Sequence, residues 1–226
     1  MTDVPTRAFS PVALRFFSLL MRRQTGDALK LIDQRLKRQR PEFVHLEILL
    51  PVIGLAGSKA ALGDITPAET HCIFSEIGQA LDQCKAAMPR QPLLGRKMLA
   101  MTLPGEMHGA GLNIISDWLW RDGWETEKMA CGRDESPAAQ QILHASPDML
   151  AISCSIPRQV ALVRRLIRRI RREAFCGSIW IGGMAINAFP ELFTRSGADH
   201  TARDIIAFTR QLAEQFHYPT ATPPEF

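Results

Sequence analysis

Hydrophobic residues in the first third of the chain recur three and four positions apart, a spacing that predicts amphipathic helices rather than strands. Four helices are expected, over residues 14–21, 28–38, 41–53 and 67–81. The fourth has a strong start signal, because Thr66 can cap the helix, Pro67 suits its first turn and Glu69 can complete a capping box. Gly54, Gly57 and Gly63 predict a loosely ordered connection before it. We therefore expect an antiparallel helical bundle over residues 10–88.

From Lys97 onward, short apolar runs alternate with amphipathic stretches, which is typical of βαβ units and a parallel sheet. Strands are expected at residues 98–103, 124–129, 149–152, 178–181 and, briefly, 198–200, with the last helix at 202–216. The second strand is polar enough for an edge, and the third is continuously apolar, which favours a central position.

The expected fold class is therefore α/β. A helical bundle is followed, after a Pro- and Gly-containing linker at 85–96, by a flavodoxin-like (Rossmann-like) five-stranded parallel sheet domain at 96–217. In the order 2-1-3-4-5, the loops after the first and third strands flank the switch point, where ligands of such sheets bind.

Composition narrows the class of protein. The chain has 226 residues, a net charge of +4 and 46% hydrophobic residues, which is ordinary for a globular protein. Its five cysteines are scattered without a C-x-x-C pair, so neither a zinc site nor a disulfide framework is expected. The N-terminus lacks a signal-peptide pattern, and no apolar run approaches the ~18 residues of a membrane span. We expect a cytoplasmic protein with no membrane partner.

The loop after the first expected strand carries Glu106, His108 and the glycines Gly109 and Gly111. An imidazole there, at the start of a helix, would be exposed and able to bind a metal. Glu106 could hydrogen-bond the second ring nitrogen and fix its tautomer, as carboxylates do for metal-bound histidines. The glycines would let a bulky group approach the backbone closely.

Two further loops have small or polar residues at strand ends. Ser153-Cys154-Ser155 follows the third strand, and Gly182-Gly183 follows the fourth, where missing side chains would leave a slot. Each segment alone is weak: a lone histidine is usually structural, and two glycines usually form a turn. All three in order, each at an expected strand end, make a more specific pattern.

Residues 97–216 resemble a cobalamin-binding domain. That family has an acidic residue, any residue, His, two residues and Gly, then Ser-x-Leu or a variant, then Gly-Gly. The corresponding segments here are Glu106-x-His108-x-x-Gly111, Ser153-x-Ser155 and Gly182-Gly183. Glu in place of Asp at the first position and Ser in place of Leu in the second segment are departures from the family pattern.

The resemblance implies a role for each segment. His108 would be the lower axial cobalt ligand in place of the cofactor's own base, with Glu106 as its orienting partner. The cofactor's base tail would run into a slot lined by Ser153, Ser155, Gly182 and Gly183. Adenosyl- or hydroxocobalamin is the expected cofactor, and haem is the alternative, because an axial histidine suits iron equally.

The helical half resembles the bundle that caps the cofactor's upper face in cobalamin-dependent regulators. That bundle usually places a Trp over the cobalt, where this chain has Lys59-Ala60-Ala61. His71 could reach that face, although an ordinary helix histidine is the commoner situation. The closest family resemblance is to photosynthesis-gene antirepressors of the AerR/PpaA type.

Residues 160–172 predict a strongly amphipathic helix. Val160, Val163, Leu166, Ile167 and Ile170 form one narrow stripe, and six arginines between Arg164 and Arg172 point the other way. The basic face could contact a phosphate backbone non-specifically or an acidic partner, or could simply be solvated.

These observations favour a cobalamin-binding regulator that responds to light or redox state and acts through a transcription factor or other protein. The alternatives are a corrinoid carrier for a methyltransferase system, a haem sensor on the same fold and a cofactor-free scaffold. No nucleophile–base constellation indicates catalysis by this chain alone. Ser153 and Ser155 have no evident catalytic partner, and the sequence does not place His144 or His200 in space.

Overall fold

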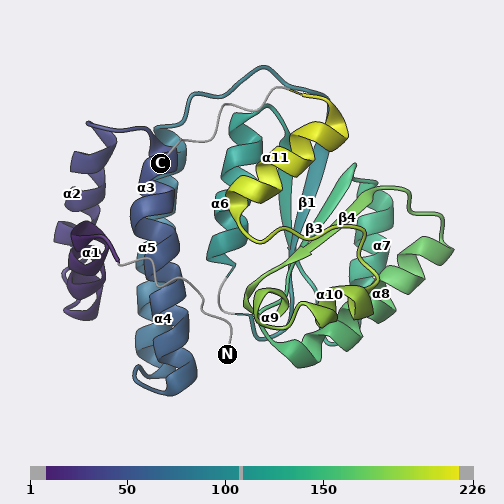
Figure 1. Cartoon of the computed structure of the whole chain (residues 1–226), viewed down its shortest axis with the longest axis horizontal. Helices are drawn as coiled ribbons and strands as arrows, with labels where there is room; N and C mark the ends of the chain where they lie inside the picture. The colour runs from purple at the N-terminus through teal and green to yellow at the C-terminus, as the bar shows by residue number, and fades with distance from the viewer. Residues whose placement is uncertain (1–8, 107–108, 219–226) are drawn as a thin grey trace. The chain divides into compact units, whose positions relative to one another are not determined.

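The computed structural model describes residues 9–106 and 109–218. It divides into two compact units, Met1–Met88 and Pro89–Phe226. The first is entirely helical in its described part, and the second contains a parallel sheet between helices (Figure 1). Met107 and His108 lie outside the described residues.

The first unit is a bundle of helices packed around an apolar core. Its elements are α1 (Pro11–Met21), α2 (Thr25–Leu36), α3 (Pro41–Val44), the π-helical turn η1 (His45–Leu49), α4 (Leu50–Leu62) and α5 (Pro67–Ala86). The capping box expected at the start of α5 is confirmed. The Thr66 hydroxyl accepts the Glu69 N–H at 3.2 Å, and the Glu69 carboxylate accepts the Thr66 N–H at 2.7 Å.

The expected end of the third helix near Ile53 is wrong, because α3, η1 and α4 follow one another as one helical segment over Pro41–Leu62. The segment passes through Gly54 and Gly57 and ends at Gly63, which has a φ of 78°. Glycine inside a helix costs only about 1 kcal/mol relative to alanine, which packing of the buried neighbours Val52 and Ala56 can offset. The π turn lies immediately before the Leu50–Pro51 step, where a proline cannot donate a normal helical hydrogen bond.

By length and composition, this 22-residue helix could cross a membrane, since an 18-residue window has a mean hydropathy of 1.4. The expectation that no such stretch exists is therefore wrong. A core helix of a bundle meets the same criteria, and Val44, Ile48 and Leu49 are fully buried in this unit. We treat the helix as part of the bundle core.

The second unit is an α/β layer structure. Its strands are β1 (Lys97–Thr102), β2 (Glu125–Ala130), β3 (Met149–Ser153) and β4 (Ser178–Gly182). Its helices are α6 (Ala110–Arg121), α7 (Ser136–Ala145), the 3-10 turn η2 (Pro157–Gln159), α8 (Val160–Arg172), α9 (Met184–Ala188), α10 (Glu191–Ser196) and α11 (Ile205–Phe216). The strand order β2-β1-β3-β4, all parallel, confirms the first four expected strands, with β2 at an edge.

Helices cover both faces of the sheet (Figure 1), and alternate residues of the central strands bury against the two layers. Leu99, Leu150 and Ile179 belong to the core shared with α7 and α8. Met98, Met149 and Trp180 belong to the core shared with α6 and α11. Burial on both faces explains the continuous apolar runs of these strands.

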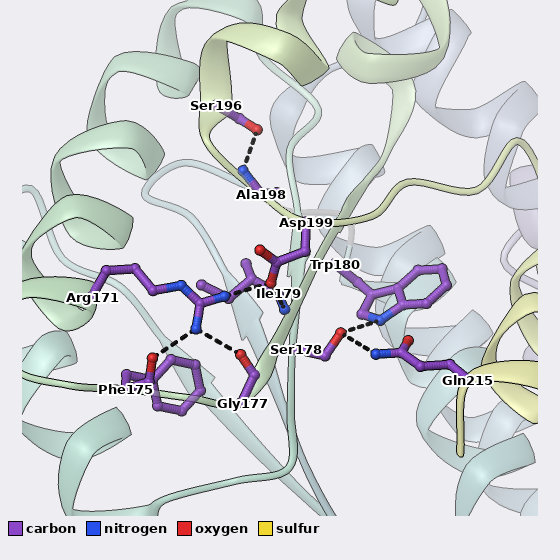
Figure 2. A network of polar contacts seen from close by, with 10 residues as sticks. All are labelled: Arg171, Phe175, Gly177, Ser178, Ile179, Trp180, Ser196, Ala198, Asp199 and Gln215. Carbon is purple, nitrogen blue, oxygen red and sulfur yellow. Dashed lines mark hydrogen bonds and ion pairs between the residues drawn. The ribbon is translucent and has the colours of Figure 1, made fainter. Parts of the chain in front are cut away.

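The expected fifth strand is wrong: residues 198–200 form only a single parallel bridge, between Trp180 and His200. The Asp199 carboxylate, rather than a backbone carbonyl, accepts the Ile179 N–H at 2.7 Å. Arg171 of α8 holds the same carboxylate at 2.5 Å and donates to the carbonyls of Phe175 and Gly177 (Figure 2). A side chain thus replaces one rung of the ladder, which limits backbone pairing to this short bridge.

Candidate cofactor site at the carboxyl end of the sheet

The three segments singled out in the sequence follow three adjacent strands. Since β1, β3 and β4 are neighbours and parallel, the loops that leave their carboxyl ends share one edge of the sheet. Ser153 is paired in register with Gly182, so the second and third segments start side by side. Within the first segment, the structure describes Glu106 and the residues from Gly109 onward, but not Met107 and His108.

Glu106 ties the loop after β1 to the loop after β3. Its Oε1 atom accepts the Ser155 N–H at 2.5 Å and the Ser153 hydroxyl at 3.3 Å, and Oε2 accepts the Leu103 N–H at a longer 3.4 Å. Burial raises the pKa of the Glu106 carboxyl, and the hydrogen bonds from Ser155, Leu103 and Ser153 oppose that rise. Oε1 is therefore the more heavily bonded oxygen, and Oε2 retains the greater capacity to accept another donor.

Gln159 makes a second link between the same two loops and was missed by the sequence analysis. Its Nε2 donates to the Pro104 carbonyl at 2.8 Å, and its Oε1 accepts the Ile156 N–H at 3.2 Å. The side chain is buried, which is unusual for glutamine unless its amide is hydrogen-bonded. The local sequence carries no signal for this contact, because its partner lies 55 positions earlier.

Gly183 belongs to a tight junction with the loop after β3. The Cys154 N–H donates to the Gly182 carbonyl at 2.8 Å, and the Cys154 carbonyl accepts the Ala185 N–H at 3.2 Å. A Cβ on Gly183 would lie 2.7 Å from the Cys154 oxygen, and its φ of 106° is one that other residues rarely adopt. Glycine is therefore required at 183 by the fold itself, whether or not a ligand binds.

Other glycines at this edge face open space. A Cβ built on Gly105, Gly111 or Gly182 would meet no atom of the described residues within 4 Å. The first and third segments thus have room beside their backbone, where a flat or extended group could approach it closely. Together with the serine hydroxyls of Ser153 and Ser155, this arrangement fits a cofactor with a long polar tail.

The proposed metal ligand, His108, lies outside the described residues, so its position remains a prediction. The described ranges contain no group of three or more His, Cys, Asp or Glu side chains suited to holding a metal ion.

The candidate residues of the first unit are placed within that unit only. Lys59 of α4 pairs with Asp64 at 3.2 Å, and His71 is exposed on α5. In the second unit, the Ser153 hydroxyl donates to Glu106, and the His200 ring stacks on Trp180 with centroids 4.6 Å apart. The Cys154 thiol is buried, and burial raises its pKa to about 11, which makes it a poor nucleophile.

Comparison with known families identifies the α/β unit. Residues 96–207 match the family of the B12 binding domain. The second unit of this chain is therefore a B12-binding domain, and the cofactor that this class of domain holds is a cobalamin or related corrinoid. No curated protein sequence matches the chain significantly.

Several solved structures share the fold. The monomethylamine corrinoid protein of Methanosarcina barkeri is 13% identical, with a TM-score of 0.69 over 91% of this chain and 98% of that one. A cobalamin-binding protein from Desulfitobacterium hafniense DCB-2 is 15% identical, with a TM-score of 0.48 and coverage of 88% and 96%. The methanol:cobalamin methyltransferase complex MtaBC from M. barkeri is 12% identical, with a TM-score of 0.48 and coverage of 96% and 85%. At 13% identity, the likeness to the monomethylamine corrinoid protein shows a shared fold.

Proposed function

We propose that this chain is a corrinoid protein: it binds cobalamin in its α/β domain and presents the cofactor to a partner protein that performs the reaction. The observation that carries the proposal is the coincidence of the B12-binding match at 96–207 with the linked loops at the ends of β1, β3 and β4. The likeness to a corrinoid protein, which extends over both units of this chain, supports the carrier role.

In this proposal the residues of the chain bind and orient the cofactor. His108 would bind the cobalt, and Glu106, which is fixed through Oε1 to Ser155, would accept the second imidazole N–H through Oε2 and hold the ring's tautomer. Ser153, Ser155 and the open backbone at Gly111 and Gly182 line the path of the cofactor's tail. The bound corrinoid supplies the cobalt at which a methyl group can be accepted and released.

A regulatory role is the second candidate, and it rests on sequence resemblance alone. Glu106 in place of the usual Asp resembles the variant found in cobalamin-dependent regulators rather than in mutases, and the chain as a whole resembles antirepressors of the AerR/PpaA type. The partner would then be a transcription factor, and light would act on the bound cofactor. We rank the carrier role first because the structural likeness over both units is to a corrinoid protein.

Haem is the weaker alternative for the cofactor. An imidazole ligand suits iron as well as cobalt. However, haem has no nucleotide tail, so the hydroxyls of Ser153 and Ser155 and the open backbone at Gly182 would have no role in binding it.

Cofactor choice is tested by the absorption spectrum of the purified full-length chain after mixing with hydroxocobalamin, adenosylcobalamin or haemin and removal of free cofactor. Retained cobalamin absorbance in the wild type is the expected result. A Soret band retained with haemin, and no cobalamin absorbance, would replace cobalamin by haem. Retention of neither cofactor would contradict the proposal altogether.

The carrier and regulatory roles differ in what the loaded protein does. A carrier charged with a ¹⁴C-methyl group on its cobalamin should transfer the label when an extract of the source cells is added in the dark. A light-dependent regulator loaded with adenosylcobalamin should instead change its spectrum and its oligomeric state on illumination. Label that stays on the protein in the dark, together with such a light response, would reverse our ranking.

A further inference from the structure

A basic groove lies on the second unit between α8 and α10, built from segments other than the cofactor-site loops. Its volume is about 850 Å³, and five arginines line it: Arg164, Arg168, Arg171, Arg172 and Arg195. Ile167 contributes an apolar floor and Thr194 a hydroxyl, whereas no carboxylate lines the groove. The proposed cofactor site uses none of these residues.

Three arginines of α8 form hydrogen bonds or ion pairs within the second unit. Arg165 pairs with Glu135 at 3.3 Å, and Arg169 bonds the Ser136 hydroxyl at 2.6 Å and Glu173 at 3.4 Å. Arg171 holds Asp199 and two backbone carbonyls, as Figure 2 shows. These side chains stabilise the domain, so they do not by themselves indicate a partner.

The remaining arginines of this helix, Arg164, Arg168 and Arg172, are exposed, and within the described residues they make no hydrogen bond or ion pair. They are four positions apart, so they form one row along the helix with a rise of ~6 Å between neighbours. Arg195, exposed on α10, faces the same groove, again without a bonded partner in the described part. Four guanidinium groups without a bonded partner therefore line a groove that contains no carboxylate of the described residues. The acidic side chains Glu135 and Glu173 line an adjacent pocket and pair with Arg165 and Arg169.

We propose that this groove docks an acidic segment of a partner protein. Guanidinium groups bind carboxylates in a bidentate manner and suit protein interfaces. Carboxylates two residues apart on an extended segment are ~6.6 Å apart, close to the spacing of the arginine row. The expectation of a partner protein rests on the proposed function. The groove itself lies outside the proposed cofactor site.

A nucleic acid fits the groove less well. Affinity for a DNA backbone grows with the number of phosphates that Lys and Arg neutralise, and the groove offers only four arginines without a bonded partner for this. Binding of single strands relies on aromatic side chains that stack on bases, and no aromatic residue lines the groove. The apolar floor at Ile167 suits a polypeptide better than a phosphate backbone.

The test is fluorescence anisotropy of a labelled 12-residue peptide of alternating glutamate and alanine, titrated with the full chain at low salt, with and without hydroxocobalamin. Arg164→Glu/Arg168→Glu/Arg172→Glu removes the row, and Arg195→Glu tests the opposite wall in case the triple variant does not fold. Arg22→Glu/Arg133→Glu/Arg210→Glu is the matched control, because it changes the net charge equally at three exposed arginines outside the groove. Circular dichroism reports on folding.

We expect the triple variant to bind the peptide about tenfold or more weakly and the single variant to bind it measurably more weakly. The control should retain wild-type affinity, and cofactor should make no difference. Three results would overturn the inference: no binding by the wild type, equal losses in the control, or tighter binding of a 20-base-pair DNA duplex that the triple variant loses. If the chain binds the peptide but not cobalamin, the docking proposal stands and only the proposed function is refuted.

Discussion

The Oε1 atom of Glu106 accepts the backbone N–H of Ser155 at 2.5 Å, although the two residues are 49 positions apart. This bond joins the loops that leave β1 and β3 on the two sides of the expected switch point. The buried Gln159 amide makes a parallel link to Pro104. Two hydrogen-bonded side chains, Glu106 and Gln159, therefore hold the loops of the candidate site together, and a substitution at either residue removes one link.

Replacing Glu106 by alanine should destabilise the fold, since it leaves the Ser155 N–H and the Ser153 hydroxyl without their acceptor. We expect a loss of about 1–3 kcal/mol in the free energy of unfolding, measured by urea denaturation. Glu106→Gln is the control, because its amide oxygen can still accept the Ser155 N–H. An alanine variant as stable as the wild type would show that the link contributes nothing.

The stability difference between the wild type and Glu106→Gln should depend on pH. Burial raises the pKa of Glu106 above its ordinary value of 4.5, so the folded chain binds this proton more tightly than the unfolded chain. The contribution is fully present below pH 4.5 and is lost as the pH rises through the raised pKa. We expect the Tm of the wild type to fall relative to that of the glutamine variant as the pH rises from 4.5 to 7. A constant difference would contradict the burial of this carboxyl.

The two glycines after β4 should respond differently to alanine. Gly183→Ala brings a Cβ to 2.7 Å from the Cys154 oxygen at a φ of 106°, and we expect a loss of about 1–3 kcal/mol in stability. Gly182→Ala meets open space and should leave the Tm nearly unchanged, but it should weaken cobalamin binding because its methyl group narrows the tail slot. Normal cobalamin affinity in Gly182→Ala would remove this residue from the site.

Arg168 and Arg171 are three positions apart on α8, but their replacement by alanine should affect the stability of the domain very differently. Arg171→Ala breaks bonds to Asp199, Phe175 and Gly177, and we expect a loss of about 1.5–3 kcal/mol in thermal or urea unfolding. Arg168→Ala, the matched control, should change stability by less than about 0.5 kcal/mol. Similar effects from both would mean that the Arg171 network does not stabilise the sheet edge.

Thiol reactivity should distinguish two cysteines. Cys154 is buried, and burial raises the pKa of its thiol to about 11, whereas Cys176 is exposed. At pH 8 a maleimide should label Cys176 within minutes and Cys154 only on unfolding, as read by mass spectrometry of peptides. Rapid labelling of Cys154 would show that the loop after β3 opens readily.

The sequence predicted the α/β class and the first four strands because buried parallel strands are continuous apolar runs and their helices are amphipathic. It failed at Gly54 and Gly57, which local propensity assigns to a loop and bundle packing retains within a helix. It also failed at residues 198–200, where the Asp199 side chain takes the place of a backbone acceptor. Both errors arise from contacts between residues distant in sequence.

The candidate site shows the same limit. The glycine and serine segments could be found from the sequence because each follows a strand in a recognisable order. From the sequence, Glu106 is expected to orient His108, which stays a prediction, and the structure adds the bonds of Glu106 to Ser153 and Ser155. Gln159 carries no local signal at all, since its role depends on a carbonyl group that only the folded chain brings near.

The central claim, that His108 binds the cobalt of a bound cobalamin, is tested most directly by electron paramagnetic resonance of the cob(II)alamin-loaded chain. The protein is prepared with ordinary histidine and with ¹⁵N-labelled histidine, which labels all six histidines, and His108→Ala identifies the one responsible. We predict that nitrogen triplets on the cobalt lines become doublets on labelling and that His108→Ala loses this change. Triplets that persist in the labelled wild type would show that the cofactor's own base, and not a histidine of this chain, binds the cobalt.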